Sequence, residues 1–373
     1  MDNFVDIVGY QFERVHTGVI SWILDTKNIS VSMDTKYEVL RGIYRICHRT
    51  IDFLPTEVQC ITCIPEYSFG RRRKIDLVVK VDLYSRTPKY LVLEMKVDSI
   101  PTSDQLLGTH TDFVQKNNCE PADAVFLLLL FGSSEACSLP ALHGFVVFGL
   151  LYIIEVFAGL HIDEYVYKSW IESLGNEEVR RTSIKTAITD APQIWDSAYW
   201  LNKGYRPWFS LFYYMYAELQ GYSKRRGEWD IYSGNNNPVM NWKYGWIDKN
   251  IMGCPVQFYW EFNYEEFVLK VLLDSNHKLP PNDLMWLRDE IAAICVRDTP
   301  HNGRRAQNRY GTFASLFRWA FDFKNQTFTE IMSGVDNILD VIHPKLFFSV
   351  RRALGVAIGN EKITDISKRR ICC

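Results

Sequence analysis

The sequence predicts an α/β fold for its first half, with a mixed central sheet flanked by helices, followed by a C-terminal α+β module. In the first half, segments with helical spacing of apolar residues alternate with short β-branched runs, in the order helix, helix, three strands, helix, two strands, helix. After Asp163 the composition changes, and the segments become rich in Trp and Tyr. We therefore predict a domain over residues 1–174 and an accessory module over residues 175–373.

The first domain is expected to begin with two helices. Between Phe4 and Leu24 the apolar residues recur at helical spacing, and Asp25-Thr-Lys-Asn28 supplies a stop. The following elements are predicted from the same periodicities: a helix over 36–50, strands over 57–69, 74–81 and 89–97, a helix from Ser103 to Val114 capped by Ser103 or Thr102, strands over 124–131 and 145–150, and a helix from about Tyr152.

The second half mixes helix and strand patterns. The runs 256–262 and 266–272 predict a hairpin, 315–323 a further strand, and 229–238 a turn-rich segment. Helices are expected over 165–174, 207–219, 281–296 and 327–341, the last ended by His343-Pro344. Seven of the nine tryptophans in this half are candidates for a core or a docking surface: Trp195, Trp200, Trp208, Trp229, Trp242, Trp246 and Trp260.

Composition is that of an ordinary folded protein. The 373 residues are 47% hydrophobic and 23% charged, and the net charge is −2, so any surface for a polyanion must be local. Nine cysteines without a leader at the start indicate a cytoplasmic protein with reduced thiols. The apolar stretch 144–160 contains Glu155 and three glycines, which favours a buried strand and helix over a membrane span.

Two acids and a lysine occupy two neighbouring predicted strands. Asp76 lies in Lys74-Ile-Asp-Leu-Val-Val-Lys-Val81, and Glu94-Met-Lys96 lies in the strand over 89–97. Because strand side chains alternate between faces, Glu94 and Lys96 project from the same face, about 6.6 Å apart. If the segment between the strands is a hairpin connection, folding about residue 85 brings Asp76 opposite Glu94. The pattern therefore predicts that these three side chains converge.

This set suits metal-dependent cleavage of a phosphodiester. Mg²⁺ prefers oxygen ligands, which Asp76, Glu94 and the Met95 carbonyl would supply, and Mn²⁺ is an alternative ion. Lys96 would orient the attacking water and offset the charge that develops at phosphorus. Glu13, on the first helix, could complete the metal shell, and Gln105 could hydrogen-bond the water or a ligand carboxylate. Glu66 competes with Glu13 as a third acid, although the neighbouring Arg71–Lys74 run favours an ion pair.

An alternative interpretation is that Glu94 and Lys96 form an ordinary solvated pair. The strand that carries them is apolar at nearly every position, which indicates a strand covered on both faces. A buried carboxylate without a partner or metal is costly, and two facing carboxylates repel unless a cation lies between them. Metal binding would relieve both penalties.

Four sequence stretches carry a resemblance to a known superfamily. Phe12-Glu-Arg-Val-His-Thr-Gly-Val-Ile-Ser-Trp-Ile-Leu24, Arg73-Lys-Ile-Asp-Leu77, Val92-Leu-Glu-Met-Lys96 and Gln105-Leu106 resemble the PD-(D/E)XK nucleases over roughly the first 150 residues. The resemblance implies a restriction-endonuclease-like αβββαβ core. It also implies an active site whose five residues fall here on Glu13, Asp76, Glu94, Lys96 and Gln105.

The resemblance extends to uncharacterised prokaryotic members proposed to act in defence against phage. It implies a Mg²⁺-dependent nuclease that hydrolyses phosphodiester bonds. DNA is favoured as the substrate, with RNA left open, and a second copy of the chain or a defence-system protein is a candidate further partner. Two other interpretations remain open at this stage. One is an inactive nuclease-fold module that binds nucleic acid or protein, and the other is a structural protein that docks through its aromatic second half.

Overall fold

A computed structural model describes residues 3–69, 74–190, 211–233, 237–274, 279–299 and 303–353. The chain divides into two compact units. The first unit takes Met1–Glu135, Leu139–Ile184 and Cys372–Cys373, and the second takes Ala136–Ser138 and Lys185–Ile371. Helix α6, Tyr165–Asp190, runs across the predicted boundary after residue 174.

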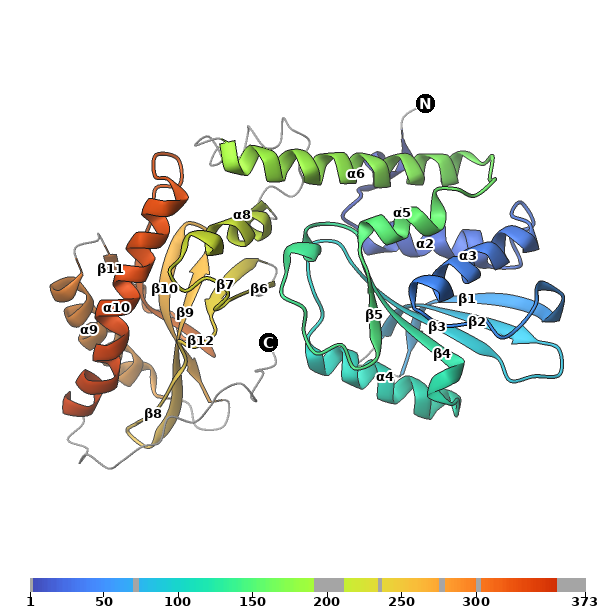
Figure 1. Cartoon of the computed structure of the whole chain (residues 1–373). Helices are drawn as coiled ribbons and strands as arrows, with labels where there is room; N and C mark the ends of the chain where they lie inside the picture. Colours follow the sequence, from blue (N-terminus) through green and yellow to red (C-terminus); the bar gives the residue numbers. More distant parts are fainter. Residues whose placement is uncertain are drawn as a thin grey trace. The chain divides into compact units, whose positions relative to one another are not determined.

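The first unit is a mixed α/β structure built on a five-stranded sheet in the order β1-β2-β3-β4-β5 (Figure 1). Strands β1 to β3 pair antiparallel, and β3, β4 and β5 pair parallel, so the predicted mixed sheet is confirmed. Its elements are α1 Phe4–Val8, α2 Glu13–Leu24, α3 Met33–Ile46, β1 Val58–Ser68, β2 Lys74–Leu83, β3 Lys89–Lys96, α4 Ser103–Asn117, β4 Ala124–Leu130, β5 Phe145–Phe148, α5 Leu150–Phe157 and α6.

Helices cover both faces of this sheet. Figure 1 shows α4 on one side and α2, α3 and α5 on the other. Alternate residues of β3 divide between two cores: Leu91 and Leu93 pack with α2, α3 and α5, whereas Tyr90 and Val92 pack with Leu106 of α4. Covering on both faces explains why the strand is apolar at nearly every position.

The predicted first helix is broken in the structure. Instead of one helix over Phe4–Leu24, α1 ends at Val8 and α2 begins at Glu13. Gly9 between them has φ +112°, a value that residues with a Cβ rarely adopt. Apolar spacing continues through the break, which is why periodicity alone predicted a single helix.

Replacing Gly9 with alanine should therefore destabilise the first unit. A Cβ at this position would lie 2.8 Å from Gln11 Nε2 and 3.0 Å from Phe12 Cδ2, in addition to the backbone strain. We expect the free energy of unfolding to fall by about 1–3 kcal/mol in urea titrations. Gly175→Ala, on α6 with open space around its Cβ, is the matched control and should be neutral or stabilising. Equal effects of the two substitutions would contradict this account.

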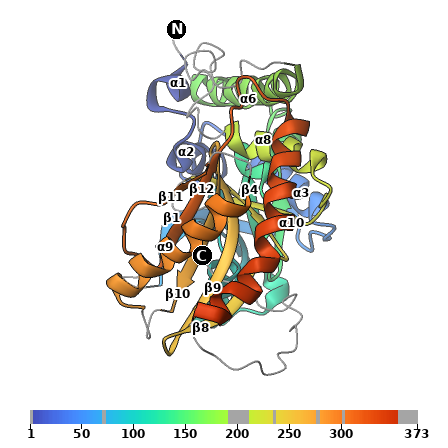
Figure 2. The same cartoon turned by 90° about the vertical axis from the view of Figure 1, so that its left-hand side faces the viewer.

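The second unit is built on an antiparallel sheet in the order β11-β12-β10-β9-β7-β6, with β8 paired to β9. Helices α9 and α10 lie on one side of its strands (Figures 1 and 2). The predicted hairpin is confirmed, since Asn263 pairs with Glu266. The elements are α8 Leu211–Leu219, β6 Trp229–Ser233, β7 Pro238–Trp242, β8 Ile247–Ile251, β9 Cys254–Asn263, β10 Glu266–Leu273, α9 Pro281–Asp298, β11 Gly303–Arg305, β12 Phe313–Ala320 and α10 Phe328–Ala353.

Two expectations for the second unit were wrong, one of them in part. Of the segment 229–238 that was expected to be turn-rich, Trp229–Ser233 forms β6 and pairs with β7, and residues 234–236 lie outside the described residues. Helix α10 continues through Pro344, which was expected to end it. Packing outweighs the lost backbone hydrogen bond, because Ile342 and Leu346 on either side of the proline are buried and Trp260 Nε1 donates to His343 Nδ1 at 3.1 Å.

The described tryptophans of the second unit belong mainly to its core. Trp229, Trp242 and Trp260 are buried, and Trp246 stacks on Tyr259 with ring centroids 4.5 Å apart. Trp195, Trp200 and Trp208 lie outside the described residues, as do the first four residues of the helix predicted over 207–219, whose remainder is confirmed as α8. Within the described ranges, no helix combines the length and apolar character needed to span a membrane.

Candidate active site

Asp76 lies at the end of the pairing between β2 and β3. The register runs from Val81 opposite Lys89 to Leu77 opposite Leu93, so its next step sets Asp76 opposite Glu94, as the sequence predicts. Asp76 Oδ2 accepts a hydrogen bond from the Met95 backbone N–H at 2.7 Å. This bond holds the carboxylate against β3 where the ladder ends.

Glu94 and Lys96 share one face of β3, as their spacing predicts. Glu94 Oε1 lies 3.0 Å from Lys96 Nζ, and only 16% and 14% of the two side chains are exposed. Lys96 Nζ also donates to the Met95 carbonyl at 2.7 Å and lies 3.6 Å from Asp76 Oδ2. The ammonium is therefore enclosed by oxygen atoms.

The third carboxylate comes from α2. Glu13 is its first residue, and Glu13 Oε1 lies 3.3 Å from Lys96 Nζ. Thr17, one turn later, donates to the Glu13 carbonyl at 3.0 Å and contacts Met95 Sδ at 3.2 Å. Three carboxylates from three elements thus converge on one lysine.

A buried hydrogen-bond chain fixes the start of α2. Trp170 Nε1 of α6 donates to His16 Nδ1 at 3.1 Å, so His16 Nε2 carries the proton and donates to the Tyr10 carbonyl at 2.8 Å. The Tyr10 hydroxyl donates to the Phe131 carbonyl at 2.7 Å, just beyond β4. Because His16 lies one turn from Glu13, this chain positions the Glu13 carboxylate relative to the sheet.

The cluster carries more negative charge than its one lysine can balance. Burial raises the pKa of Glu94 to about 7, with the Lys96 ammonium acting against the increase and the Asp76 carboxylate adding to it. Burial likewise raises the pKa of Glu13. Burial alone would lower the pKa of Lys96, but the three carboxylates raise it above its usual value. The site favours additional positive charge, either a proton or a cation.

None of the known protein-family profiles, curated proteins or solved structures matches this chain. The interpretation of the cluster therefore depends on its geometry and chemistry.

The donor atoms of the cluster are of the type that binds a hard cation, but they are not arranged as a preformed metal site. The carboxylates of Glu13, Asp76 and Glu94, with the Met95 carbonyl, are the oxygen ligands that Mg²⁺ prefers. In the described part of the chain, however, no three His, Cys, Asp or Glu side chains are grouped closely enough to hold a metal ion. The Lys96 ammonium lies among the carboxylates, so binding an ion there requires these side chains to move apart from the lysine.

Two other candidate residues have different partners. Gln105 is exposed in the first turn of α4, where its Oε1 accepts from the Thr102 N–H at 2.8 Å and closes a capping box. Its predicted role beside the catalytic water remains a prediction. Glu66 pairs with Lys74, the last residue of the neighbouring basic run, at 2.7 Å, as expected, and also with Arg14 of α2 at 2.5 Å. Glu13 is the third acid at Lys96.

Sequence reasoning missed the supporting residues of the site. His16 and Trp170 are far apart in the sequence, and no spacing rule connects them. Thr17 had a usable signal, because it lies one turn after Glu13 on the same side of the helix.

Proposed function

We propose that the first unit is a Mg²⁺-dependent nuclease domain with a restriction-endonuclease-like core that hydrolyses phosphodiester bonds, with DNA as its substrate. The observation that carries the proposal is the convergence of Glu13, Asp76 and Glu94 on Lys96 Nζ, at 3.3, 3.6 and 3.0 Å. The β1 to β3 meander, the helix α4 and the parallel strand β4 that follow it support this core. The resemblance to defence-associated nucleases makes invading phage DNA the proposed target.

Each side chain has a role that its position supports. Glu13, Asp76 and Glu94 would hold Mg²⁺, which when bound supplies an activated water and neutralises charge on the phosphate oxygens. Lys96 lies between these ligands, where its ammonium can orient the attacking water and stabilise negative charge in the transition state. The Met95 N–H holds Asp76 and the His16 chain holds the start of α2, so the rearrangement that ion binding requires is limited to separating Lys96 from the carboxylates.

A second candidate function is a nuclease-fold module that binds nucleic acid without cleaving it. The observation in its favour is that the Lys96 ammonium pairs with all three carboxylates and so compensates part of their charge. The two functions differ in one measurable property, since only the nuclease requires a divalent ion.

Cleavage assays test the proposal directly. Plasmid, single-stranded DNA and RNA are incubated with the protein in Mg²⁺, Mn²⁺ or EDTA, and we expect DNA loss only with a divalent ion. Asp76→Asn should reduce the rate by about a hundredfold or more. Asp82→Asn is the matched control, because Asp82 lies on the same strand but pairs with Lys80 at 2.6 Å. No cleavage of any substrate under any metal would favour the binding module.

A further inference from the structure

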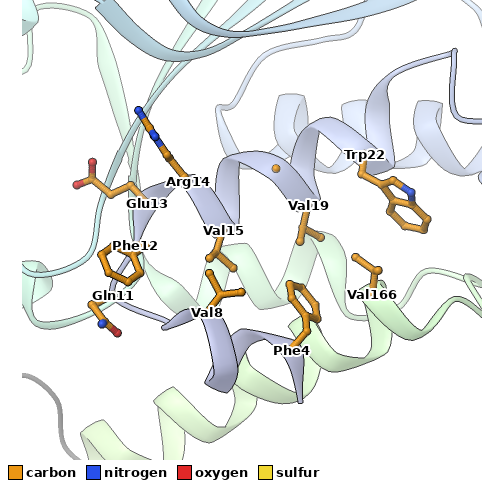
Figure 3. A pocket seen from close by; sticks show the side chains of 11 residues that line it. Phe4, Val8, Gln11, Phe12, Glu13, Arg14, Val15, Val19, Trp22 and Val166 are labelled. Atoms are coloured by element: carbon orange, nitrogen blue, oxygen red, sulfur yellow. The ribbon is translucent and has the colours of Figure 1, made fainter. Parts of the chain in front are cut away.

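An apolar groove runs along α2 and ends at the acid cluster. Its volume is about 830 Å³, and its walls come from α1, α2 and α6, including Phe4, Val8, Val19 and Val166. Figure 3 shows these side chains gathered beside α2, with Glu13 at the N-terminal end of the helix. Glu13 belongs both to the groove lining and to the Lys96 cluster. A ligand in the groove would therefore reach the candidate active site.

The groove exposes aromatic and aliphatic surface that folding leaves uncovered. Phe12, immediately before Glu13, is 53% exposed, and Val8 is also 53% exposed. Trp22 lines the other end of the groove and is half-buried. Contiguous apolar surface of this kind marks a binding site more often than single exposed residues do.

Cations lie at the end of the groove that adjoins the active site. Arg14 lines the groove, and 86% of its side chain is exposed. Its partner Glu66, 44% exposed, also pairs with Lys74, two residues before Asp76 on β2. Exposed ion pairs contribute little to stability, so a phosphate can replace the Glu66 carboxylate between these two cations.

We propose that this groove receives unstacked bases of single-stranded DNA, whose backbone passes Arg14 and Lys74 on its way to the acid cluster. The inference rests on the proposed nuclease function and names its substrate class. Bases inside a duplex are paired and stacked and cannot enter a lateral apolar groove, whereas single strands bind through base–aromatic stacking combined with backbone charge. The charge at one end and the continuity with Glu13 favour a nucleic acid over an apolar protein segment.

Gly18 allows the groove to be filled without touching the acid cluster. It lines the groove on α2, and a Cβ at this position would meet no atom within 4 Å. Gly18→Leu should therefore occupy the space, whereas Gly18→Ala should leave most of it open. Gly175→Leu on α6, also with open space around its Cβ, is the control for adding leucine to an exposed helix. Phe12→Ala is a second variant that removes the stacking surface instead of filling the groove.

The test measures dissociation constants for a fluorescent single-stranded oligonucleotide and for its duplex in EDTA, where hydrolysis does not interfere. We expect the unmodified protein to prefer the single strand, and Gly18→Leu and Phe12→Ala to weaken that binding about tenfold. Gly18→Ala and Gly175→Leu should bind like the unmodified protein. Arg14→Ala should reduce the slope of log affinity against log salt by about 0.7.

Unchanged binding by both Gly18→Leu and Phe12→Ala, or equal affinity for duplex and single strand, would overturn the inference. A change in oligomeric state on Gly18→Leu with unchanged oligonucleotide binding would assign the groove to a second copy of the chain instead. Because binding is measured without metal, the groove inference can hold even if the cleavage assays fail. Conversely, cleavage that is unaffected by filling the groove would leave the nuclease proposal standing and remove this one.

Discussion

Replacing Lys96 with methionine is expected to abolish hydrolysis and to lower the free energy of unfolding of the metal-free protein by about 3–5 kcal/mol. Methionine keeps an apolar stem of similar length but removes the only ammonium within salt-bridge distance of Glu13, Asp76 and Glu94 among the described residues. Three carboxylates, two of them with pKa values already raised by burial, would then repel one another.

Magnesium should recover much of that stability, since the vacated centre of the cluster suits a cation. At a concentration of one hundred times the dissociation constant, a bound ion contributes about 2.7 kcal/mol. Urea unfolding of Lys96→Met with and without Mg²⁺ measures this recovery, and the cleavage assays with plasmid and single-stranded DNA measure hydrolysis. Cleavage by Lys96→Met at the unmodified rate would refute the role proposed for the ammonium.

Lys89 provides a control on the same strand. Its side chain is 11% exposed, close to the 14% of Lys96, and its Nζ lies 2.8 Å from Asp123 and 3.0 Å from Asp52. Lys89→Met should also destabilise the protein, but Mg²⁺ should not restore its stability and hydrolysis should be retained. If Mg²⁺ rescued both variants equally, its effect would not come from the Lys96 cluster.

The part of the site that the sequence predicted is the part that local rules determine. Period-two alternation sets Glu94 and Lys96 on one face, and a hairpin centred near residue 85 sets Asp76 opposite Glu94. The contact of Glu13 with Lys96 depends on how α2 packs on the sheet, and no spacing encodes that distance. Glu13 was predicted to belong to the site only as a candidate third acid and through the resemblance, and neither gave its distance from Lys96.

Where one residue can serve two roles, the sequence does not say which one the structure uses. Gln105 follows Thr102 at capping-box spacing, and the structure uses its carboxamide at the helix start. Glu66 could have been a ligand, and its pairing with Arg14 depends on the approach of α2 to β1.

The positions at which helices end were also predicted incorrectly from the sequence. Apolar periodicity runs unbroken through Gly9, so one helix was expected where the positive φ of Gly9 separates α1 from α2. The groove beside α2 is lined by α1, which is a separate helix. A prediction of one continuous helix could not include this groove. Pro344 shows the reverse error, since a local stop signal was outweighed by burial along α10.

Glu94→Gln is expected to stabilise the metal-free protein at pH 8 and to have little effect near pH 4.5. The pKa of Glu94 is raised from 4.5 to about 7 by burial, so the folded protein holds a proton that the unfolded chain releases between these values. The stability associated with that proton is fully present below pH 4.5 and is lost as the pH rises through 7. The loss amounts to about 3 kcal/mol above pH 7, and a neutral glutamine avoids it.

Urea unfolding at pH 4.5 and pH 8 in EDTA measures the difference in stability between Glu94→Gln and the unmodified protein. A second measurement replaces EDTA with Mg²⁺. Since the ion competes with the Glu94 proton, its stabilising effect on the unmodified protein should grow from pH 5 to pH 8. Glu66→Gln is the control of opposite sign, because hydrogen bonds from Lys74 and Arg14 lower the pKa of the exposed Glu66 carboxyl. Its effect should be small and destabilising at pH 8.

A Glu94→Gln protein that is less stable than the unmodified protein at pH 8 would contradict this prediction. It would show that the surroundings of Glu94 stabilise the ionised carboxylate, contrary to the electrostatics described for the cluster.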